Sequence, residues 1–373
     1  HCGKENRKMN FLQALQYCID NRLIFAAYRL PHSDAIKLVV QKSPTSNAAT
    51  INSELFDQKG FILSPFLKSE KYPSYFIQPD LVYSSTNYLN FDELLQVQHP
   101  VQEENIYENG VIGKKEFKIQ VESIIEAIRQ NKFKKAVLSR TKVLERNYRC
   151  KLKEIFQLLS TSYTNAFVYM VNVGGQFWMG ATPEPLLCAH KNELETVSLA
   201  GTKPYNDENL NITNWSHKDQ VEQELVTQYI EETFENRGFQ FTQKNGPYTK
   251  KAGNLVHLRT DFTYNLAEVG KQLGELVSEL HPTPAVCGLP KQAAMDFIQS
   301  IEKHQRSYYS GFLGPVNIDD KLQLFVNLRC MQVMDERLIL YIGAGITAES
   351  DAEEEWNETE IKADTLLSVI HKV

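Results

Sequence analysis

The chain has 373 residues, of which 42% are hydrophobic and 23% are charged, and its net charge is −6. These values are ordinary for a globular protein, and the length allows one large domain or two. The acidic balance gives no electrostatic reason to expect nucleic acid or an anionic membrane as a partner, and no apolar run is long enough to cross a bilayer.

The cysteines and the start of the chain bear on the compartment. No Cys-x-x-Cys pair and no histidine-rich spacing accompanies the cysteines, so a zinc or redox site is not expected. No signal-peptide pattern opens the chain, and a reduced cytoplasmic setting fits best. The six cysteines are at positions 2, 18, 150, 188, 287 and 330.

The first third of the chain is rich in loops and carries no motif that points to chemistry. Residues 1–114 are therefore predicted to be an N-terminal scaffold portion that belongs to the same fold as the rest. The elements predicted here are a helix over residues 10–20 and strands over 22–30, 36–41, 60–67 and 74–77.

The pattern changes after residue 115, where a buried lysine is expected. Apolar residues at helical spacing predict a helix over residues 116–131, and a strand follows over 134–144. Side chains alternate along a strand, so Lys135 shares a face with Val137, whereas Lys134 faces the other way. A lysine in mid-strand beside valines is a poor surface element, so one of the two lysines must point toward packed structure.

A carboxylate between two prolines follows the next strand pair. After a helix over residues 151–162 and strands over 166–172 and 176–181 comes the segment Gly180-Ala-Thr-Pro-Glu-Pro185. Proline on both sides fixes the local backbone, which predicts that Glu184 is held at a strand end in one pose. Taken alone, an ordinary exposed turn acid explains the same pattern.

The next candidates lie in a turn and on a helix. Residues 199–204 are predicted to form a turn that offers a hydroxyl and free amides. On the predicted helix over residues 217–235, Glu222 shares a stripe with apolar side chains and is expected to point inward. Asp219, one turn earlier, lies close to the same face.

The segments between residues 255 and 343 contain two further polar residues of interest, His257 and Arg329. His257 is interpreted as a satisfied sheet residue rather than a ligand. Arg329 is expected either to bind an anion or to pair with a core acid. Residues 281–290 are too rich in proline for regular structure and are expected to form a shaped loop. The predicted elements are strands over residues 255–265, 324–333 and 337–343, and helices over 271–280 and 291–303.

The segment after the last strand is strongly acidic, since seven of the twelve residues from 349 to 360 are Asp or Glu. Ser350 and Glu353 predict a capping box that begins a helix. A solvated first turn explains Glu353 and Glu354, because negative charge is favourable at a helix N-terminus.

Two other acids of this helix are expected to be buried. Glu355, Glu358 and Lys362 lie at i, i+3 and i+7, and their stripe continues through apolar residues. A face that becomes apolar further along is normally the inward one. Two inward carboxylates need a partner, and a divalent cation is the obvious one.

The order of the elements predicts the fold class. Strands and helices alternate irregularly, without a strict βαβ pattern, which favours an α+β fold with largely antiparallel sheet. No internal repeat, no Gly-x-Gly-x-x-Gly, no P-loop and no Gly-x-Ser-x-Gly motif is present.

Eight short motifs between residues 135 and 362 occur in an order that is typical of one family. They are Lys135-Ala-Val-Leu-Ser-Arg140, Gly180-Ala-Thr-Pro-Glu184, Leu199-Ala-Gly-Thr202, Lys218-Asp-Gln-Val-Glu222, His281-Pro-Thr-Pro-Ala-Val-Cys-Gly288, Leu328-Arg329, Gly343-Ala-Gly-Ile346 and Glu355-Trp-Asn-Glu-Thr359 with Lys362. In this order they resemble the chorismate-utilising enzymes, and most closely isochorismate synthase. The resemblance covers residues 115–373, which are thus expected to be the chorismate-binding catalytic region.

The resemblance implies a large fold with curved, mostly antiparallel sheets flanked by helices around a central cleft that binds chorismate and Mg²⁺. It implies that Glu222 and Glu358 hold the metal, with Glu355 and Asp219 supporting it directly or through water. The substrate-binding residues that it implies are Gly201, Thr202, Gly288, Arg329, Gly345 and Lys362.

The resemblance also implies a reaction, in which water adds at C2 of the ring while the C4 hydroxyl leaves. By position, Lys135 is the base and Glu184 the acid. Near neutral pH this requires a partly neutral amine and a partly protonated carboxyl, and burial favours both uncharged forms.

Departures from related enzymes narrow the expected reaction. Relatives that form anthranilate or aminodeoxychorismate typically have glutamine in place of Lys135 and use ammonia, so the lysine favours water and no amidotransferase subunit is required. Ala200 replaces a lysine of the aminodeoxychorismate enzymes. The loop over residues 281–286 favours an enzyme that stops at isochorismate over a salicylate synthase, which goes on to eliminate pyruvate. Gln223 departs from the histidine found in many relatives.

Other functions remain as alternatives. A non-catalytic chorismate-binding relative has no use for the Lys135 and Glu184 pair, and a Ca²⁺-stabilised structural protein leaves the buried lysine unexplained. Of the two pathways that use isochorismate, the short chain favours menaquinone over catechol siderophore synthesis. The expected partner is chorismate, without nucleic acid or membrane, and the oligomeric state is left open.

Overall fold

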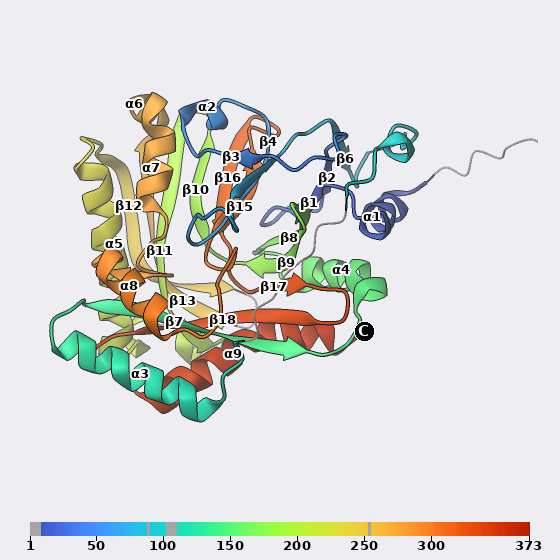
Figure 1. Ribbon diagram of the computed structural model, residues 1–373. Helices are drawn as coiled ribbons and strands as arrows, with labels where there is room; N and C mark the ends of the chain where they lie inside the picture. The colour runs from blue at the N-terminus through green and yellow to red at the C-terminus, as the bar shows by residue number, and fades with distance from the viewer. Residues whose placement is uncertain (1–8, 88–89, 102–109, 253–254) are drawn as a thin grey trace, which may run out of the picture.

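Two nine-stranded sheets form the centre of the computed structural model, which describes residues 9–87, 90–101, 110–252 and 255–373 (Figure 1). Within these residues every pairing between named strands is antiparallel, which confirms the predicted α+β class with antiparallel sheet. In spatial order, sheet A contains β14 (Gly288–Leu289), β7 (Lys135–Leu144), β18 (Leu338–Ile346), β17 (Cys330–Val333), β9 (Gln176–Thr182), β8 (Phe167–Val173), β1 (Phe25–Arg29), β2 (Ile36–Val40) and β6 (Leu81–Ser84). Sheet B contains β12 (Phe241–Ala252), β13 (Leu255–Asn265), β11 (Glu193–Pro204), β10 (Pro185–His190), β16 (Lys321–Val326), β15 (Phe312–Val316), β4 (Gly60–Ser64), β5 (Ser74–Ile77) and β3 (Ala48–Ala49).

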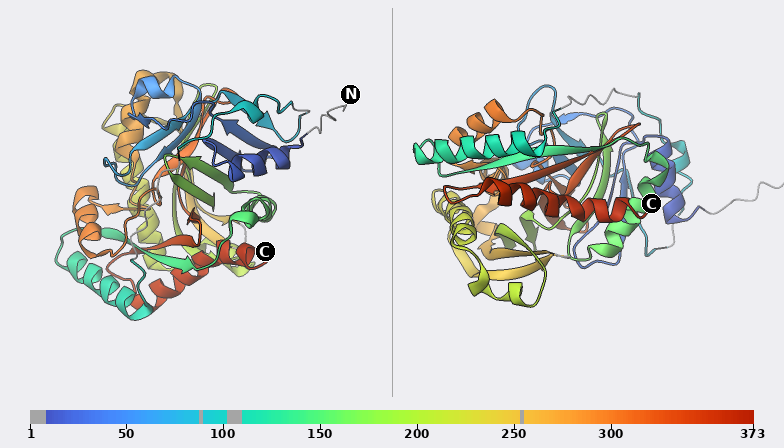
Figure 2. Two further views of the ribbon diagram at one scale, coloured as in Figure 1. Left: turned by 45° about the vertical axis from the view of Figure 1, so that its right-hand side comes forward. Right: turned by 90° about the horizontal axis from the view of Figure 1, so that it is seen from below.

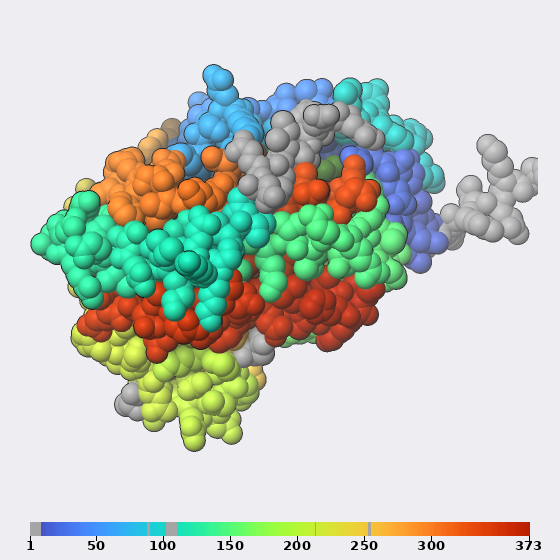
Figure 3. All heavy atoms as spheres, turned by 60° about the horizontal axis from the view of Figure 1, so that its bottom comes forward, coloured from blue at the N-terminus to red at the C-terminus, as the bar shows by residue number. Residues whose placement is uncertain are grey.

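The helices cover the outer faces of the two sheets. Figure 2 shows α3 and α9 running along one face, and in Figure 3 they form neighbouring bands across it. The helices are α1 (Phe11–Asp20), α2 (Ser53–Phe56), α3 (Lys114–Arg129), α4 (Leu152–Ser162), α5 (His217–Glu235), α6 (Leu266–Val269), α7 (Leu273–Leu280), α8 (Lys291–Ile301) and α9 (Ala352–Ile370).

Apolar side chains fill the space between the sheets and the space under the helices. Phe61, Trp178 and Phe325 belong to a buried cluster between sheets A and B. A second cluster packs α1, α4 and α9 against sheet A, and a third packs α5 and α7 against sheet B. Burial of this apolar surface is the main force that holds the layers together.

The first third of the chain contributes strands to both sheets. β1, β2 and β6 extend sheet A, where β1 pairs with β8, and β3, β4 and β5 extend sheet B, where β4 pairs with β15. The predicted scaffold portion over residues 1–114 therefore shares its sheets with the remainder of the chain. Of this portion, residues 1–8, 88–89 and 102–109 lie outside the described residues.

Capping residues set where the main helices begin. Asn10 and Gln13 form a capping box at α1, and Ser216 and Asp219 form one at α5. The capping box predicted from Ser350 and Glu353 is wrong, because the side chain of Asp351 caps α9 instead, accepting hydrogen bonds from Glu353 N and Glu354 N. The Ser350 hydroxyl is used before the helix, where it accepts from Thr347 N.

A predicted turn proves to be part of a strand. Residues 199–204 continue β11, which pairs with β13, so the prediction of a turn is wrong. The register shifts between Ala200 and Lys203, and Gly201 has a φ of +72°. This bulge explains the turn-like sequence, since a bulge also favours glycine and breaks the alternation of a regular strand.

No helix in the part of the chain that the structure describes is both long and apolar enough to span a lipid bilayer. Five cysteines lie in this part, and all five are free thiols, of which Cys18, Cys287 and Cys330 are buried. Cys2 lies outside the described residues.

Candidate active site

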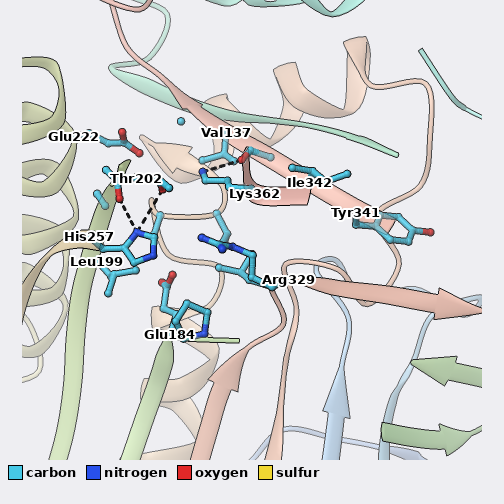
Figure 4. Close-up of a pocket in the computed structure, with 18 of the residues that line it drawn as sticks. Val137, Glu184, Leu199, Thr202, Glu222, His257, Arg329, Tyr341, Ile342 and Lys362 are labelled. Carbon is cyan, nitrogen blue, oxygen red and sulfur yellow. Dashed lines mark hydrogen bonds between the residues drawn. The ribbon is translucent and has the colours of Figure 1, made fainter. Parts of the chain in front are cut away.

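A cavity lies where the chain crosses between the two sheets. One crossing leads from β9 in sheet A to β10 in sheet B, and the other leads back from β16 to β17. The crossings are joined by backbone hydrogen bonds of 3.0 Å, from Ala181 N to Arg329 O and from Val326 N to Glu184 O. Glu184 and Arg329 therefore lie on adjacent crossings, and Figure 4 shows both side chains pointing into the same space.

The crossing at Arg329 corrects another prediction. A single strand over residues 324–333 is wrong, because β16 ends at Val326 and β17 begins at Cys330 in the other sheet. Arg329 has a φ of +47°, a left-handed conformation that is uncommon for a residue with a side chain. Its guanidinium lines the cavity and donates to Thr365 Oγ1 at 2.9 Å, and its role in binding an anion stays a prediction.

Seven of the twelve predicted site residues line this cavity. They come from both crossings, from β11, α5 and β18, and from α9, which are far apart in the sequence. The seven are Glu184, Gly201, Thr202, Glu222, Arg329, Gly345 and Lys362. The other five, described below, are Lys135, Asp219, Gly288, Glu355 and Glu358.

Glu184 is buried and protonated more readily than an ordinary carboxyl. Burial raises the pKa of Glu184 to about 7, against the opposing effects of Lys135, Lys362 and Arg329. The flanking residues Pro183 and Pro185 hold it between β9 and β10, as predicted for a fixed pose at a strand end. An exposed turn acid is excluded, because only 4% of Glu184 is accessible to solvent.

Lys135 is the inward lysine of its strand. It is fully buried, whereas Lys134 is exposed, which confirms that one of the two points into packed structure. Its Nζ forms an ion pair with Glu222 Oε1 at 3.0 Å. Lys135 therefore lies behind the Glu222 carboxylate that lines the cavity, and its role as a base stays a prediction.

Glu222 is as deeply buried as Glu184 but is ionised. Burial alone would raise its pKa, but Lys135, Lys218 and Lys362 outweigh burial and lower the pKa of Glu222 to about 2. The helical stripe correctly predicted that this side chain points inward from α5.

Two further glutamates approach Glu222 from α9. Glu355 is 2% exposed, and the inward stripe of Glu355, Glu358 and Lys362 is confirmed. Lys362 Nζ is 2.6 Å from Glu358 Oε1. Lys362 also donates to Gly343 O at 3.0 Å, which is the hydrogen bond drawn at Lys362 in Figure 4. Burial raises the pKa of Glu355 to about 7, an effect that Lys218 opposes and Glu358 reinforces.

Asp219 has a structural partner of its own. Its carboxylate accepts a hydrogen bond of 2.6 Å from the Ser216 hydroxyl within the capping box of α5. It also faces the bulge of β11, since a Cβ built on Gly201 would lie 3.4 Å from Asp219 Oδ1. Its predicted supporting role at a metal stays a prediction.

His257 was not predicted to belong to the site, but it lines the cavity. Its Nδ1 lies 2.7 Å from Gly201 O, and because a carbonyl only accepts, Nδ1 carries the proton. Burial, reinforced by Arg329, lowers the pKa of His257 to about 3, so the ring is neutral. The interpretation as a satisfied sheet residue holds for Nδ1 only, because Nε2 is buried without a hydrogen-bond partner.

Gly345 and Gly288 lie on opposite sides of β7 and allow close approach to Lys135. A Cβ on Gly345 would lie 2.1 Å from Glu222 Oε1 and 3.2 Å from Lys135 Cε. A Cβ on Gly288 would lie 2.2 Å from Lys135 O, so this glycine packs on the strand backbone rather than on the cavity. At both positions an added side chain would collide with these atoms, which explains why glycine is present.

A buried ionic network that the sequence did not reveal supports the cavity wall. Arg306 donates to Val137 O at 2.6 Å and to Val286 O at 2.7 Å, and both of these residues line the cavity. The same guanidinium pairs with Glu302, which accepts from Ser139 N at 2.7 Å. The network ties β7 to the segment over residues 281–290, which was predicted to lack regular structure but contains the short strand β14 paired with β7.

The three glutamates Glu222, Glu355 and Glu358 have the donor chemistry of a Mg²⁺ site. They converge on the ammonium of Lys218, at distances of 3.6, 3.0 and 3.9 Å. Glu355 Oε2 is buried without a hydrogen-bond partner, so an oxygen remains to be satisfied. In this conformation the described residues include no group of three His, Cys, Asp or Glu side chains close enough to hold a metal directly. The donor set fits the ion, and the lysine now fills the point of convergence.

The comparison with known families agrees with this geometry. Residues 74–371 match the family described as chorismate binding enzyme, which is more than half of the chain. The chain belongs to this family. The match begins well before residue 115, where the predicted catalytic region begins, and so includes strands of the N-terminal third.

Two curated relatives are named as isochorismate synthases. Isochorismate synthase MenF of Bacillus subtilis is 26% identical over 257 residues, which cover 67% of this chain and 54% of the relative. Isochorismate synthase EntC of Escherichia coli is 33% identical over 201 residues, which cover 52% of this chain and 51% of the relative. The matched parts thus span about half the length of these curated relatives.

Solved structures show the same chorismate-binding fold. DhbC of Bacillus anthracis, described as a 2,3-dihydroxybenzoate-specific isochorismate synthase, matches with a TM-score of 0.76 at 23% identity and covers 96% of this chain and 99% of its own. MenF of Escherichia coli, the menaquinone-specific isochorismate synthase, matches with a TM-score of 0.75 at 19% identity and covers 98% and 92%. At these identities the likeness establishes the fold.

Gln223, which follows the predicted metal ligand Glu222, has a structural role. Gln223 is buried, and its amide nitrogen contacts the hydroxyls of Ser198, Thr227 and Thr260 at 2.8 to 3.0 Å. These contacts fix α5 on β11 and β13, so the helix that carries Glu222 is anchored at the neighbouring position.

Proposed function

We propose that the protein is an isochorismate synthase, a Mg²⁺-dependent isomerase that converts chorismate to isochorismate. The observation that carries the proposal is the pairing of a buried, readily protonated acid with a buried amine beside one cationic cavity. Glu184 has the raised pKa that a proton donor needs, at about 7. Lys135 adjoins the same cavity through Glu222 at 3.0 Å. A protein that only binds a ligand has no need of either feature.

The chain offers two cationic groups to an anionic substrate. Arg329 and Lys362 both line the cavity, and chorismate carries two carboxylates. Mg²⁺ held by Glu222, Glu355 and Glu358 would supply further positive charge for a substrate carboxylate. The neutral ring of His257 presents Nε2, a hydrogen-bond acceptor, to a hydroxyl in the same space.

The proposed isomerisation adds one water and releases one. Once Lys135 has given up its ammonium proton, its neutral amine accepts a proton from the water whose oxygen bonds to C2, the ring double bond shifts, and the bond from C4 to its hydroxyl oxygen breaks. Glu184 donates the proton with which that hydroxyl leaves as water. A single acid and a single base therefore balance the reaction without an external reductant, oxidant or second subunit.

Product analysis tests this proposal. The protein incubated with chorismate and Mg²⁺ should form isochorismate, and a chelator should stop the reaction. Glu184→Gln should lower kcat by about 100-fold or more, because it removes the proton donor while keeping the shape of the side chain. Salicylate with pyruvate would identify a salicylate synthase, and anthranilate formed with ammonia would refute the use of water.

The assignment to a pathway stays a prediction. The names of the relatives include a menaquinone-specific enzyme and a 2,3-dihydroxybenzoate-specific one, so they point to both uses of the product. The expectation that menaquinone synthesis is the pathway is best tested by growth of a deletion strain with and without added menaquinone.

A further inference from the structure

Lys218 lies at the centre of the acidic cluster. It is on the first turn of α5, and each of its three recorded ion pairs is with a predicted metal ligand. The distances from its Nζ are 3.0 Å to Glu355 Oε1, 3.6 Å to Glu222 Oε2 and 3.9 Å to Glu358 Oε2. Carboxylates from two helices thus surround one point, and a lysine nitrogen occupies that point.

The three carboxyls of this cluster are matched in number by three amines before any ion enters. Each glutamate has one lysine within about 3 Å, and the three pairs are Lys135 with Glu222 at 3.0 Å, Lys362 with Glu358 at 2.6 Å, and Lys218 with Glu355 at 3.0 Å. A divalent cation added to this matched set would leave an excess of positive charge in a largely buried place. At least one amine must therefore move away when the cation binds.

Lys218 is the amine that can leave. Lys135 has no exposed surface and extends from the interior of sheet A. Lys362 is about as exposed as Lys218, with 19% against 15% of its side-chain surface, but it is also held by a hydrogen bond to Gly343 O at 3.0 Å. The Lys218 side chain keeps 15% of its surface exposed, and its neighbour His217 is 75% exposed, so the helix end is next to solvent. A lysine stem of four carbons can move its ammonium from the cluster into that solvent.

We propose that Lys218 is the internal counter-ion of the metal site and that a divalent cation must displace its ammonium in order to bind Glu222, Glu355 and Glu358. This inference rests on the metal of the proposed function. The lysine keeps three carboxylates together in the metal-free protein, where they would otherwise repel one another. The same lysine competes with the cation and weakens its binding. The buried, unpartnered Oε2 of Glu355 is an independent sign that this place takes a further ligand.

The experiment is a titration of the full chain with Mg²⁺ alone, followed by calorimetry, together with thermal melting with and without Mg²⁺. Lys218→Met removes the charge and keeps the length of the side chain. We expect it to bind Mg²⁺ roughly tenfold more tightly than the unsubstituted protein, since a positive competitor is lost. We also expect a lower melting temperature without Mg²⁺ and a larger rise when Mg²⁺ is added.

Three further variants separate the loss of this amine from a general change of charge. Lys218→Gln should act like Lys218→Met and decides the question if the methionine variant does not fold. Lys218→Arg keeps the competing charge and should not tighten binding. Lys142→Met removes a lysine that pairs with Glu360 at 3.3 Å on the same helix α9 but outside the cluster, and should leave the affinity for Mg²⁺ unchanged.

The outcomes distinguish this inference from the proposed function. If the unsubstituted protein binds Mg²⁺ and both neutral variants bind it equally or more weakly, the counter-ion role is overturned while the metal site stands. If none of the proteins binds Mg²⁺, the metal site and the counter-ion role both fail. Product analysis with a chelator then shows whether isochorismate is formed without the metal.

Discussion

Glu184 and Glu222 lie in the same cavity and are both deeply buried, yet they differ in protonation. Burial raises the pKa of Glu184 to about 7, whereas the pKa of Glu222 is lowered to about 2. The difference comes from the neighbours. Glu222 has the Lys135 ammonium at 3.0 Å, whereas no ion pair of 4.0 Å or less is recorded for Glu184 among the described residues. Burial alone therefore does not decide the charge of a carboxyl here.

This contrast assigns different tasks to two residues of the same type. Near neutral pH about half of the Glu184 side chains carry a proton that can be given to a leaving group. Glu222 stays negative over the whole physiological range, which suits a residue that holds cations. The two ends of the cavity are thus an acid end at the sheet crossings and an anionic end between α5 and α9.

The largest expected effect is the loss of the ion pair at the anionic end. Lys135→Met leaves Glu222 buried beside an apolar side chain, with Lys218 at 3.6 Å as the remaining close cation. Removal of one partner of a buried pair typically costs about 3 to 5 kcal/mol, so we expect a loss of that order in the free energy of unfolding. Urea denaturation at pH 7 measures it. Catalytic activity should be lost as well.

A matched substitution shows whether burial causes this cost. Lys142→Met also removes a lysine from a strand position of β7, but its pair with Glu360 is about one third exposed. Such a pair contributes about 1 kcal/mol or less. Equal losses in the two variants would show that Lys135 and Glu222 do not form a special buried pair.

The second prediction concerns the acid end and depends on pH. The folded protein holds the Glu184 proton up to about pH 7, whereas an ordinary glutamate releases it near 4.5. The stability that this proton contributes is present below pH 4.5 and is lost as the pH rises through 7. Glu184→Gln does not titrate, so relative to the unsubstituted protein it should gain on the order of 3 kcal/mol between pH 4.5 and pH 8.

Glu222→Gln is the control for this pH dependence. The carboxylate of Glu222 contributes stability above pH 4.5 that is lost only as the pH falls toward 2. Its substitution should therefore cost the same at pH 5 and at pH 8, measured by urea denaturation at both values. A difference that changes with pH for Glu222→Gln, or stays constant for Glu184→Gln, would contradict the contrast between the two acids.

The anionic end could be predicted from the sequence, because its glutamates lie on helices whose periodicity shows which side chains point inward. The predicted bounds of α5 match the structure, and the helical stripes of Glu222 and Glu355 were enough to place both carboxylates inside. Capping was less certain, since Ser350 and Asp351 are both good caps and only the backbone path decides between them.

The acid end could be predicted only in part. The place of Glu184 at a strand end was predicted correctly, but nothing local shows that the chain changes sheets there. The apolar alternation runs from residue 324 to 333 as though one strand were present, because β16 and β17 are both buried although they lie in different sheets. His257 was assigned to the sheet for the same reason. Nδ1 of the ring contacts Gly201 O on β11, and Nε2 is left unpaired. The alternation of apolar residues along one strand does not reveal a contact with another strand.

The smallest expected effect tests how closely the anionic end is packed. Gly345→Ala places a methyl group 2.1 Å from Glu222 Oε1, so the carboxylate or the strand must move. Overpacking of this kind costs about 1 to 3 kcal/mol, and displacement of Glu222 should also weaken Mg²⁺ binding. Gly113→Ala is the control, because no atom lies within 4 Å of its added methyl group and only the helix cap of α3 changes, at about 0.5 to 1 kcal/mol. If Gly345→Ala resembles this control in both stability and Mg²⁺ affinity, Glu222 has room to move. The close contact of β18 with the ion pair of Lys135 and Glu222 then does not determine the charge at this end of the cavity.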